Sequence, residues 1–464
     1  MRATKVEGTR PVKRTGNLGI PILALLLAAF GVLMVYSASY YTAEHQTGDA
    51  FFYMKKHLIG LVLGCATMAA AAIFPYGKLK KLKWPALILS LVLLAAVFVP
   101  GLGVENYGAT RWIGIGPVTI QPSEIAKYGF VLFAAAYSSE KPERLRTFRG
   151  MLPVLGAGGA VCLLIILEPN MSVTMCTGMV MLVMLFLGGV KLRHLTAVLL
   201  PVAALVPVLI LIEPYRLQRL NAFLDPWSSP QGEGYQLIQS LYALGNGGWL
   251  GTGLFRSVQK YRYLPFAESD FILAVIGEEL GFVGILLLFC AFGLLIWFGV
   301  RTAARSRDRF GFLLAGGITA AIAVQTLVNA LVVSGSIPPT GLPLPLISAG
   351  NTSLIFTMAA IGVLFNISRG APRTYLFAPL DAGLFSVTFF PLFPYYGFRK
   401  RIFSAGARFT AKEGGFAAKG VSYGKICHRG RRAAVRRGGN SVRKKRRAAP
   451  AGRRGADGRA RCHS

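Results

Sequence analysis

The chain has 464 residues, of which 53% are hydrophobic and 15% are charged. Because a soluble globular protein carries about 25% charged residues, this composition excludes an ordinary soluble domain and indicates a membrane protein. The formal net charge of +32 bears on orientation, since lysine and arginine collect in the cytoplasmic loops of membrane proteins.

Ten apolar stretches follow one another along the chain, each near the length of about 17 to 25 residues that a membrane-spanning helix needs. They cover residues 18–38, 57–74, 84–100, 122–137, 151–167, 171–190, 195–212, 271–298, 310–333 and 345–367. We therefore predict an all-α polytopic integral membrane protein with about ten transmembrane helices. The first stretch exceeds the apolar core of about 7 to 15 residues found in signal peptides, so we interpret it as a membrane helix.

Lysine and arginine alternate between the loops that join these stretches. The amino terminus holds five, and the loops 75–83, 138–150, 188–194 and 301–309 hold four, four, two and four. The intervening short loops hold two, one, none and none. The positive-inside rule thus predicts that both termini are cytoplasmic. It places the long loop 213–270, between the seventh and eighth helices, outside the cytoplasm.

Composition divides the chain into a basic cytoplasmic amino terminus at 1–17, a membrane domain at 18–370 and a basic cytoplasmic tail at 371–464. Within the tail, residues 399–464 hold 21 lysines and arginines against two acids. Such a block is predicted to be disordered and attracts anionic lipids. We predict membrane lipids but no specific nucleic acid as its partner. A solvated tail without any partner and an out-of-frame extension of the gene stay open.

Motifs for other chemistry are missing from the sequence. No C-x-x-C or His-rich spacing suggests a metal site, and no G-x-x-x-x-G-K-[ST] run points to ATP hydrolysis. None of the six cysteines falls in an outward loop, so no disulfide framework is implied.

Asp270 closes the long loop at the point where the eighth helix enters the membrane. Charged residues at membrane depth are costly and usually mark function, so we predict a functional site here. A structural alternative is that Ser269 or Asp270 caps the helix by accepting its free amides. Glu278 and Glu279 follow in the same helix and are expected to face the bundle interior, paired with Arg or Lys.

The outward loop 101–121 and the helix after it carry a second group of polar residues. Arg111 and Trp112 stand among Gly and Pro turns, whereas Glu124 and Lys127 interrupt the fourth apolar stretch. The last two are three residues apart and can pair on one helix face. One interpretation is a structural ion pair that lets a short helix insert. The other is a polar cavity wall in which Lys127 or Arg111 attracts phosphate.

The long outward loop combines positive charge with a predicted interfacial helix. Arg216, Arg219 and Lys260 supply the charge. Residues 235–244 place apolar side chains at helical spacing, which predicts an amphipathic helix at the membrane surface. The Gly-dense run at 245–253 predicts a tight turn with exposed backbone amides.

A Pro-rich run at 335–353 precedes the last helix and carries Ser348 and Ser353. It is a candidate re-entrant segment, because irregular backbone at membrane depth is tolerated where it is buried or lines a cavity. Gln325 and Asn329, in the preceding helix, are expected to hydrogen-bond between helices.

Five segments resemble the shape, elongation, division and sporulation family: RWIGIGPVTIQPSEIAK, PYRLQRLNAFLDPW, GYQLIQSLYALGNGGWLGTG, QKYRYLPFAESDFILAVIGEELG and GSIPPTGLPLPLISAGNTS. The runs YSAS after the first helix and QKYRYLP before Asp270 are more similar to the division or sporulation branch than to the elongation branch. The chain departs from the family at Asn170, where Pro-Asp-x-Gly-Thr is usual. It also departs at Phe255, in the usual Gly-Leu-Gly, and at Asn351 and Thr352, in the usual Gly-Gly-Ser-Ser.

The resemblance implies a peptidoglycan glycosyltransferase that polymerises lipid II at the outer face of the bacterial cytoplasmic membrane, at the division septum or in sporulation. It implies a class B penicillin-binding protein, which is a transpeptidase, as partner, together with other divisome proteins. By the same resemblance, the essential Asp of the family falls on Asp270. Its QPSE-x-x-K motif falls on residues 121–124 and Lys127, and its RW pair on Arg111 and Trp112.

Lipid II carries its sugar on a pyrophosphate, which is a good leaving group, so the reaction needs a base for the acceptor hydroxyl and positive charge for the departing group. Asp270 is the candidate catalytic base. The candidate substrate-binding residues are Arg111, Trp112, Glu124, Lys127, Arg216, Lys260, Ser348 and Ser353. A divalent cation, Mg²⁺ or Mn²⁺, is an open alternative for holding the pyrophosphate, with no metal ligands assigned. A lipid II flippase or transporter and a noncatalytic scaffold for a transpeptidase are the two rival functions.

Overall fold

The computed structural model of the chain describes residues 16–370, except for 107–108, 117, 213 and 262. The predicted basic tail and most of the basic amino terminus lie outside the described residues.

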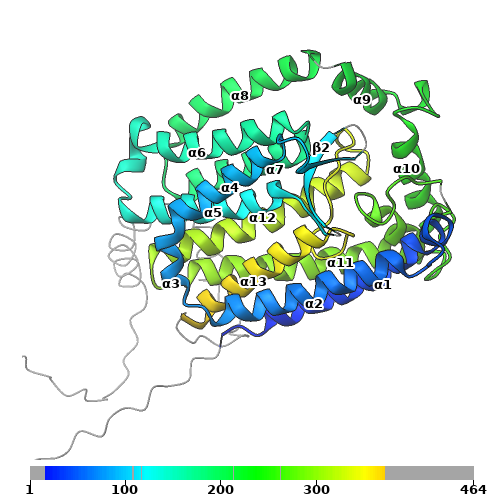
Figure 1. The fold of residues 1–464 in the computed structure, drawn as a ribbon, viewed down its shortest axis with the longest axis horizontal. Helices are drawn as coiled ribbons and strands as arrows, with labels where there is room; N and C mark the ends of the chain where they lie inside the picture. Colours follow the sequence, from blue (N-terminus) through cyan, green and yellow to red (C-terminus); the bar gives the residue numbers. More distant parts are fainter. Residues whose placement is uncertain (1–15, 107–108, 117, 213, 262, 371–464) are drawn as a thin grey trace, which may run out of the picture. The chain divides into compact units, whose positions relative to one another are not determined.

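Each of the ten apolar stretches lies on a helix, and these helices pack alongside one another (Figure 1). They are α1 (Gly19–Thr47), α2 (Phe52–Ile73), α4 (Lys83–Ala96), α5 (Pro122–Glu140), α6 (Phe148–Leu167), α7 (Met171–Leu187), α8 (Leu192–Ile212), α11 (Ile272–Ala304), α12 (Arg309–Val333) and α13 (Asn351–Gly370). Within the described residues, six of them (α1, α2, α6, α11, α12 and α13) are long and apolar enough to cross a membrane. The chain is therefore a multi-pass membrane protein, and the count of about ten spans stays a prediction.

Local signals in the sequence place the starts of several helices. α5 begins at Pro122, since proline suits the first helical position, where its missing N–H is not needed. Asn170 caps α7 by accepting a hydrogen bond from the amide of Val173 at 3.3 Å. Thr147 caps α6 in the same way, accepting from the amide of Gly150 at 3.3 Å.

The capping role predicted for Ser269 or Asp270 is wrong. α11 begins at Ile272, and its N-cap position is Phe271, which makes no side-chain cap hydrogen bond. Asp270 therefore stands before the cap position, at the junction between the loop and the helix.

The outward loop 101–121 folds into a small antiparallel sheet, which the all-α prediction missed. Its strands are β1 (Gly103–Asn106), β2 (Ala109–Ile115) and β3 (Val118–Ile120), in the order β1-β2-β3. Trp112 pairs with Val104, and Ile113 pairs with Ile120. Runs of β-branched and aromatic residues between Gly turns favour strands, but the segment is short enough to resemble an irregular loop in sequence. Strand β2, which carries Arg111, packs against α5.

The long loop contains α9 (Pro214–Leu224), the 3₁₀ turn η3 (Pro226–Ser228) and α10 (Tyr235–Gly247). α10 confirms the predicted amphipathic helix, because it buries Leu237 and Ile238 and leaves Tyr242 exposed. It packs on α11, and Ser240 Oγ donates to the carbonyl oxygen of Val333 at 2.8 Å. The long loop is thus a folded layer on the helix ends.

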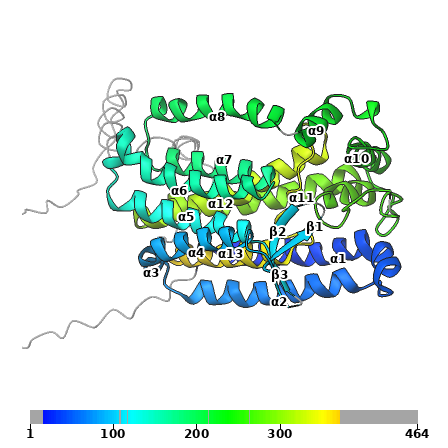
Figure 2. The ribbon, with the colours of Figure 1, turned by 45° about the horizontal axis from the view of Figure 1, so that its top comes forward.

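The two sets of loops gather at opposite ends of the helices (Figure 2). At one end lie α3 (Tyr76–Leu79) and the 3₁₀ turns η1 (Lys80–Leu82) and η2 (Arg144–Arg146). There Tyr76 donates to Asp308 Oδ1 at 2.7 Å, and Arg309 donates to the carbonyl of Gly188 at 2.7 Å. The sheet, α9 and α10 lie at the other end. This segregation is the one that the alternation of basic loops predicts.

The orientation can be tested by cysteine labelling in a background without the tail cysteines. Gln231→Cys, exposed in the long loop, should react with a membrane-impermeant maleimide on intact cells. Lys78→Cys, exposed at the opposite end, should react only after the membrane is opened. Labelling of Lys78→Cys in intact cells would reverse the assigned orientation.

Candidate active site

The backbone around Asp270 is tied to the irregular segment between α12 and α13. Three consecutive carbonyl oxygens, those of residues 268–270, accept hydrogen bonds from the Ala349 amide at 2.9 Å, Ser348 Oγ at 2.5 Å and Asn329 Nδ2 at 2.8 Å. Because the carbonyl groups of three successive residues are hydrogen-bonded, the backbone that carries the Asp270 side chain is held in place.

The Asp270 side chain is half-buried and lies outside the membrane-spanning part of α11. Burial raises the pKa of Asp270 to about 6, and the negative charge of Glu268 adds to the rise. Arg111 and Arg219 oppose it, so both guanidinium groups lie within electrostatic reach of the carboxyl. A carboxyl with a pKa near neutrality can accept a proton at physiological pH, as a general base must.

The two arginines come from separate segments and are held by backbone carbonyls. Arg111 on β2 donates from Nη2 to the carbonyl of Pro169 at 2.6 Å. Arg219 on α9 donates from Nη1 to the carbonyl of Pro339 at 3.3 Å, and its Nε lies 3.6 Å from Glu233 Oε2. Positive charge from the sheet and from the long loop therefore acts on the Asp270 carboxyl.

Among the described side chains of the long loop, that of Arg219 acts electrostatically on Asp270. The side chain of Arg216 lies outside the described residues. Trp112 is half-buried on β2 next to Arg111.

Glu124 and Lys127 form the predicted ion pair, with Lys127 Nζ donating to Glu124 Oε2 at 2.9 Å and both residues fully buried. Lys127 also donates to Gln325 Oε1 on α12 at 2.5 Å, and Ser353 Oγ donates to Glu124 Oε2 at 2.8 Å. The pair therefore joins α5 to α12 and α13, which favours the structural interpretation.

The segment between α12 and α13 links this pair to Asp270. Gln325 Nε2 donates to the carbonyl of Pro343 at 2.9 Å, and Asn329 Nδ2 donates to that of Leu342 at 2.7 Å as well as to that of Asp270. Both residues thus act between elements, as predicted. Ser348 and Ser353, predicted to bind substrate, both donate hydrogen bonds to other segments: Ser348 to the carbonyl of Ser269 and Ser353 to the carboxylate of Glu124.

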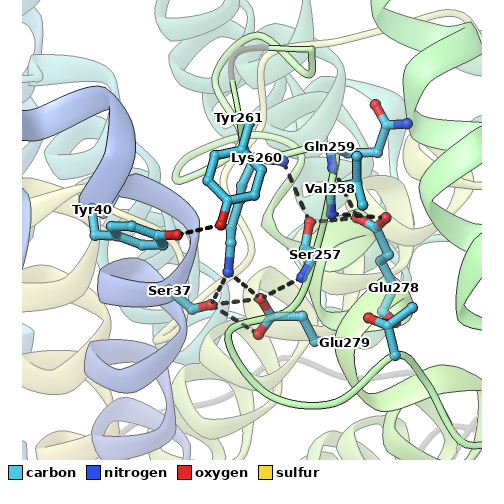
Figure 3. Close-up of polar contacts among 10 residues, drawn as sticks. Ser37, Tyr40, Ser257, Val258, Gln259, Lys260, Tyr261, Glu278 and Glu279 are labelled. Carbon is cyan, nitrogen blue, oxygen red and sulfur yellow. Dashed lines mark hydrogen bonds and ion pairs between the residues drawn. The ribbon is translucent and has the colours of Figure 1, made fainter. Parts of the chain in front are cut away.

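Lys260, predicted to hold pyrophosphate, is committed elsewhere in the structure. It is fully buried, and its Nζ lies 2.9 Å from Glu279 Oε1 on α11 (Figure 3). The contact confirms that Glu279 pairs with a basic residue. Lys260 is engaged in a buried ion pair, and its role in holding pyrophosphate stays a prediction.

A carboxylate that the sequence reasoning missed follows α6. Glu168 is fully buried, and neither of its carboxylate oxygens has a hydrogen-bond partner among the described residues. Burial raises the pKa of Glu168 to about 8, and Arg111 opposes the rise. The available signal was the position of Glu168 in the sequence, since it is an acid that directly follows an apolar stretch, in the short outward loop 168–170.

Comparison with known proteins identifies the fold and the family. A family model of cell cycle proteins that comprises FtsW, RodA and SpoVE matches residues 18–372. The chain belongs to this family. The resemblance read from the sequence motifs is therefore confirmed, and the basic tail lies almost wholly outside the match.

Two curated relatives in the FtsW, RodA and SpoVE family are similar over nearly their whole length. Stage V sporulation protein E of Bacillus subtilis is 39% identical over 363 residues, which cover 77% of this chain and 98% of the relative. A protein named "Probable peptidoglycan glycosyltransferase FtsW" of Geobacter sulfurreducens is 38% identical over 360 residues, which cover 77% and 96%.

Solved structures share the fold. One chain, from a structure described as "Structural coordination of polymerization and crosslinking by a peptidoglycan synthase complex", has a TM-score of 0.64 at 30% identity and covers 76% of this chain and 98% of its own. Rod shape determining protein RodA of Thermus thermophilus has a TM-score of 0.58 at 26% identity, with coverage of 78% and 100%.

In this FtsW, RodA and SpoVE family member, removing Lys127 alone should strongly destabilise the fold. Lys127→Met leaves Glu124 buried without its cation, and breaking a buried pair costs about 3–5 kcal/mol. The double variant Glu124→Gln/Lys127→Met should recover most of that loss, because no buried charge remains. Thermal unfolding of the purified protein in detergent measures both. Lys55→Met, which breaks the exposed Lys55–Asp49 pair, is the control and should change stability by less than about 1 kcal/mol.

Proposed function

We propose that the chain is a peptidoglycan glycosyltransferase that polymerises lipid II, with Asp270 as the general base. The enzyme class follows from the family and from relatives named as peptidoglycan glycosyltransferases. The observation that carries the role of Asp270 is its setting: a half-buried carboxyl with a pKa raised to about 6, on a tied backbone, within reach of two arginines.

In the proposed reaction, Asp270 accepts the proton of the acceptor sugar hydroxyl as its oxygen attacks the anomeric carbon of the donor. The bond between that carbon and the pyrophosphate oxygen breaks, and its electron pair leaves with the pyrophosphate. A single displacement of this kind inverts the anomeric centre. Arg111 and Arg219 are placed to stabilise the negative charge of the departing group, and fixed cations aimed at developing charge supply much of enzymatic rate enhancement.

A divalent cation remains part of the proposal as an alternative to the arginines. Glu268 lies close enough to Asp270 to raise its pKa, and Mg²⁺ is commonly bound through one or two carboxylates together with substrate phosphates. A set of three or more candidate metal ligands is absent among the described residues, so Glu268 and Asp270 would hold the ion only jointly with the substrate. Bound there, it would neutralise charge on the pyrophosphate.

We propose a transpeptidase of the class B penicillin-binding type as partner and the division septum as the site of action. Support comes from a structural neighbour whose description names polymerization and crosslinking by one peptidoglycan synthase complex. The relatives include both FtsW proteins and a sporulation protein, which favours the septal and sporulation branch over elongation.

Replacing the base tests the proposal. With the transpeptidase partner and labelled lipid II, Asp270→Asn should lower the rate of glycan formation by about 10²- to 10⁴-fold, the usual contribution of a general base. Asp225→Asn, an exposed acid in the same loop, is the matched control and should polymerise at the native rate.

Other outcomes of this experiment favour the rival functions. Equal glycan from the native protein and Asp270→Asn would remove Asp270 from the mechanism. Lipid II transport without glycan from either protein would favour a flippase. A native chain that binds the partner but neither polymerises nor transports lipid II would favour a scaffold.

The pH dependence of polymerisation provides a second test. Asp270 acts as a base only when ionised, and its pKa is raised to about 6. The kcat/KM for lipid II should therefore fall about tenfold per pH unit below pH 6 and level off above it. Initial rates from about pH 5 to 8 measure this profile. A flat profile across that range, or a rate that rises as the pH falls, would contradict the assignment.

A further inference from the structure

Helix α11 is broken nine residues after it begins, at Gly281, which has a φ of +66°. A run of the long loop, residues 248–253, fills the break. The amides of Thr252 and Gly253 donate to the carbonyls of Glu278 and Glu279 at 2.9 and 3.0 Å, and those of Phe282 and Val283 donate to the carbonyls of Gly248 and Trp249 at 2.9 and 3.1 Å. The backbone groups that the break leaves free are therefore satisfied by the loop.

Glycine makes this insertion possible. A Cβ on Gly251, which has a φ of +81°, would lie 2.2 Å from the carbonyl oxygen of Glu279, and one on Gly281 would lie 2.3 Å from the amide nitrogen of Gly251. Both distances are far below van der Waals contact. In the Gly-dense run predicted as a tight turn, the amides of Thr252 and Gly253 thus donate hydrogen bonds to α11 and are not free to bind a ligand.

The side chains at the break are held as tightly as the backbone. Glu279 is fully buried and receives Lys260 Nζ at 2.9 Å, the Ser257 amide at 3.3 Å, and Ser37 Oγ of α1 at 2.7 and 2.8 Å from its two oxygens (Figure 3). Three segments of the chain, from α1, the long loop and α11, therefore converge on one carboxylate.

Glu278, also fully buried, is held by the same loop. Its oxygens accept hydrogen bonds from Ser257 Oγ, from the Val258 amide at 3.1 Å and from the Gln259 amide at 3.3 Å. Three successive residues of the loop thus wrap one carboxylate, as Figure 3 shows. We call Ser37, Ser257, Lys260, Glu278 and Glu279 together the glutamate clamp.

The clamp is also anchored on α1 by aromatic side chains. Lys260 Nζ lies 5.1 Å from the centre of the Tyr40 ring, within the range of a cation–π contact. The hydroxyl of Tyr40 lies 2.6 Å from that of Tyr261 in the loop. The loop is therefore fixed to two helices at once.

We propose that the glutamate clamp is a positioning device for Asp270, which makes Lys260 a positioning residue of the polymerase; this rests on the proposed function of Asp270. The first half of α11, residues 272–280, is about 13 Å long, and its residues 272–279 are all buried. Asp270 stands just before this half-helix, and the clamp holds its far end. The ties of residues 268–270 to Asn329, Ser348 and Ala349 hold the near end of this half-helix. Because Gly281 separates its far end from the rest of α11, the clamp completes the support that sets where the Asp270 carboxyl points.

The proposal is tested by removing the charges of the clamp without leaving one unpaired. In Lys260→Met/Glu279→Gln no buried charge remains, and such replacements are often neutral for stability. We expect a folded protein with a native melting temperature, a kcat for lipid II polymerisation lowered about 10- to 100-fold by misplacement of the base, and a KM changed less than about twofold. The pKa seen in the pH profile should move down from about 6 as Asp270 becomes more hydrated.

Two controls make the result specific. Lys83→Met/Glu140→Gln removes a 2.6 Å ion pair at the opposite end of the helices and should leave kcat and the pH profile native. Ser37→Ala removes one donor from Glu279 while keeping both charges, so it should fold in any case and lower kcat by a few-fold.

Native kcat in the folded double variant would overturn the proposal, and so would native kcat in Ser37→Ala if the double variant does not fold. A raised KM with native kcat would also overturn it and return Lys260 to the role of a substrate ligand. These results are distinct from failure of the proposed function, which would appear as full activity of Asp270→Asn with the clamp intact.

Discussion

The pairing and hydrogen bonding of three buried glutamates at one end of the helices is the constraint on which much of the structure depends. An unpaired charge inside a protein is costly, and removing one partner of a buried pair costs about 3–5 kcal/mol. Glu124, Glu278 and Glu279 are fully buried, and each accepts at least one hydrogen bond from a distant segment of the chain. Because most of these donors lie on loops, the loops are drawn onto the helix ends and form an ordered layer there.

Asp270 differs from these three glutamates in the exposure of its side chain to solvent. Its backbone is tied like theirs, but its side chain stays half-exposed and burial outweighs the two nearby arginines, so its pKa rises to about 6. A carboxylate held in a close ion pair would have a low pKa and would be a poor base. The same end of the protein thus contains fully buried carboxylates that join segments of the chain, and the half-buried carboxyl of Asp270, whose raised pKa suits proton transfer.

Three residues at which the motifs depart from the family pattern, Asn170, Asn351 and Thr352, lie at contacts near the helix ends. Asn170 caps α7, and Thr352 accepts a hydrogen bond from the Gln121 amide at 3.3 Å. Asn351 packs so closely on α2 that a Cβ at Gly60 would lie 2.6 Å from its side-chain oxygen. All three residues therefore take part in contacts between segments that are distant in the sequence or belong to different elements.

The sequence by itself determined the helices, the alternation of loops and the Glu124–Lys127 pair, and it predicted a functional site at Asp270, because hydropathy and spacing within one helix act between near neighbours in the chain. Only the tertiary structure decided that Lys260 pairs with Glu279, that the charge of Arg219 acts on Asp270, that Glu168 is buried with the charge of Arg111 acting on it, and that the loop 101–121 forms a sheet. Each of these depends on where a loop crosses the helix ends. That path is set by packing and charge neutralisation between distant segments, which no local pattern records.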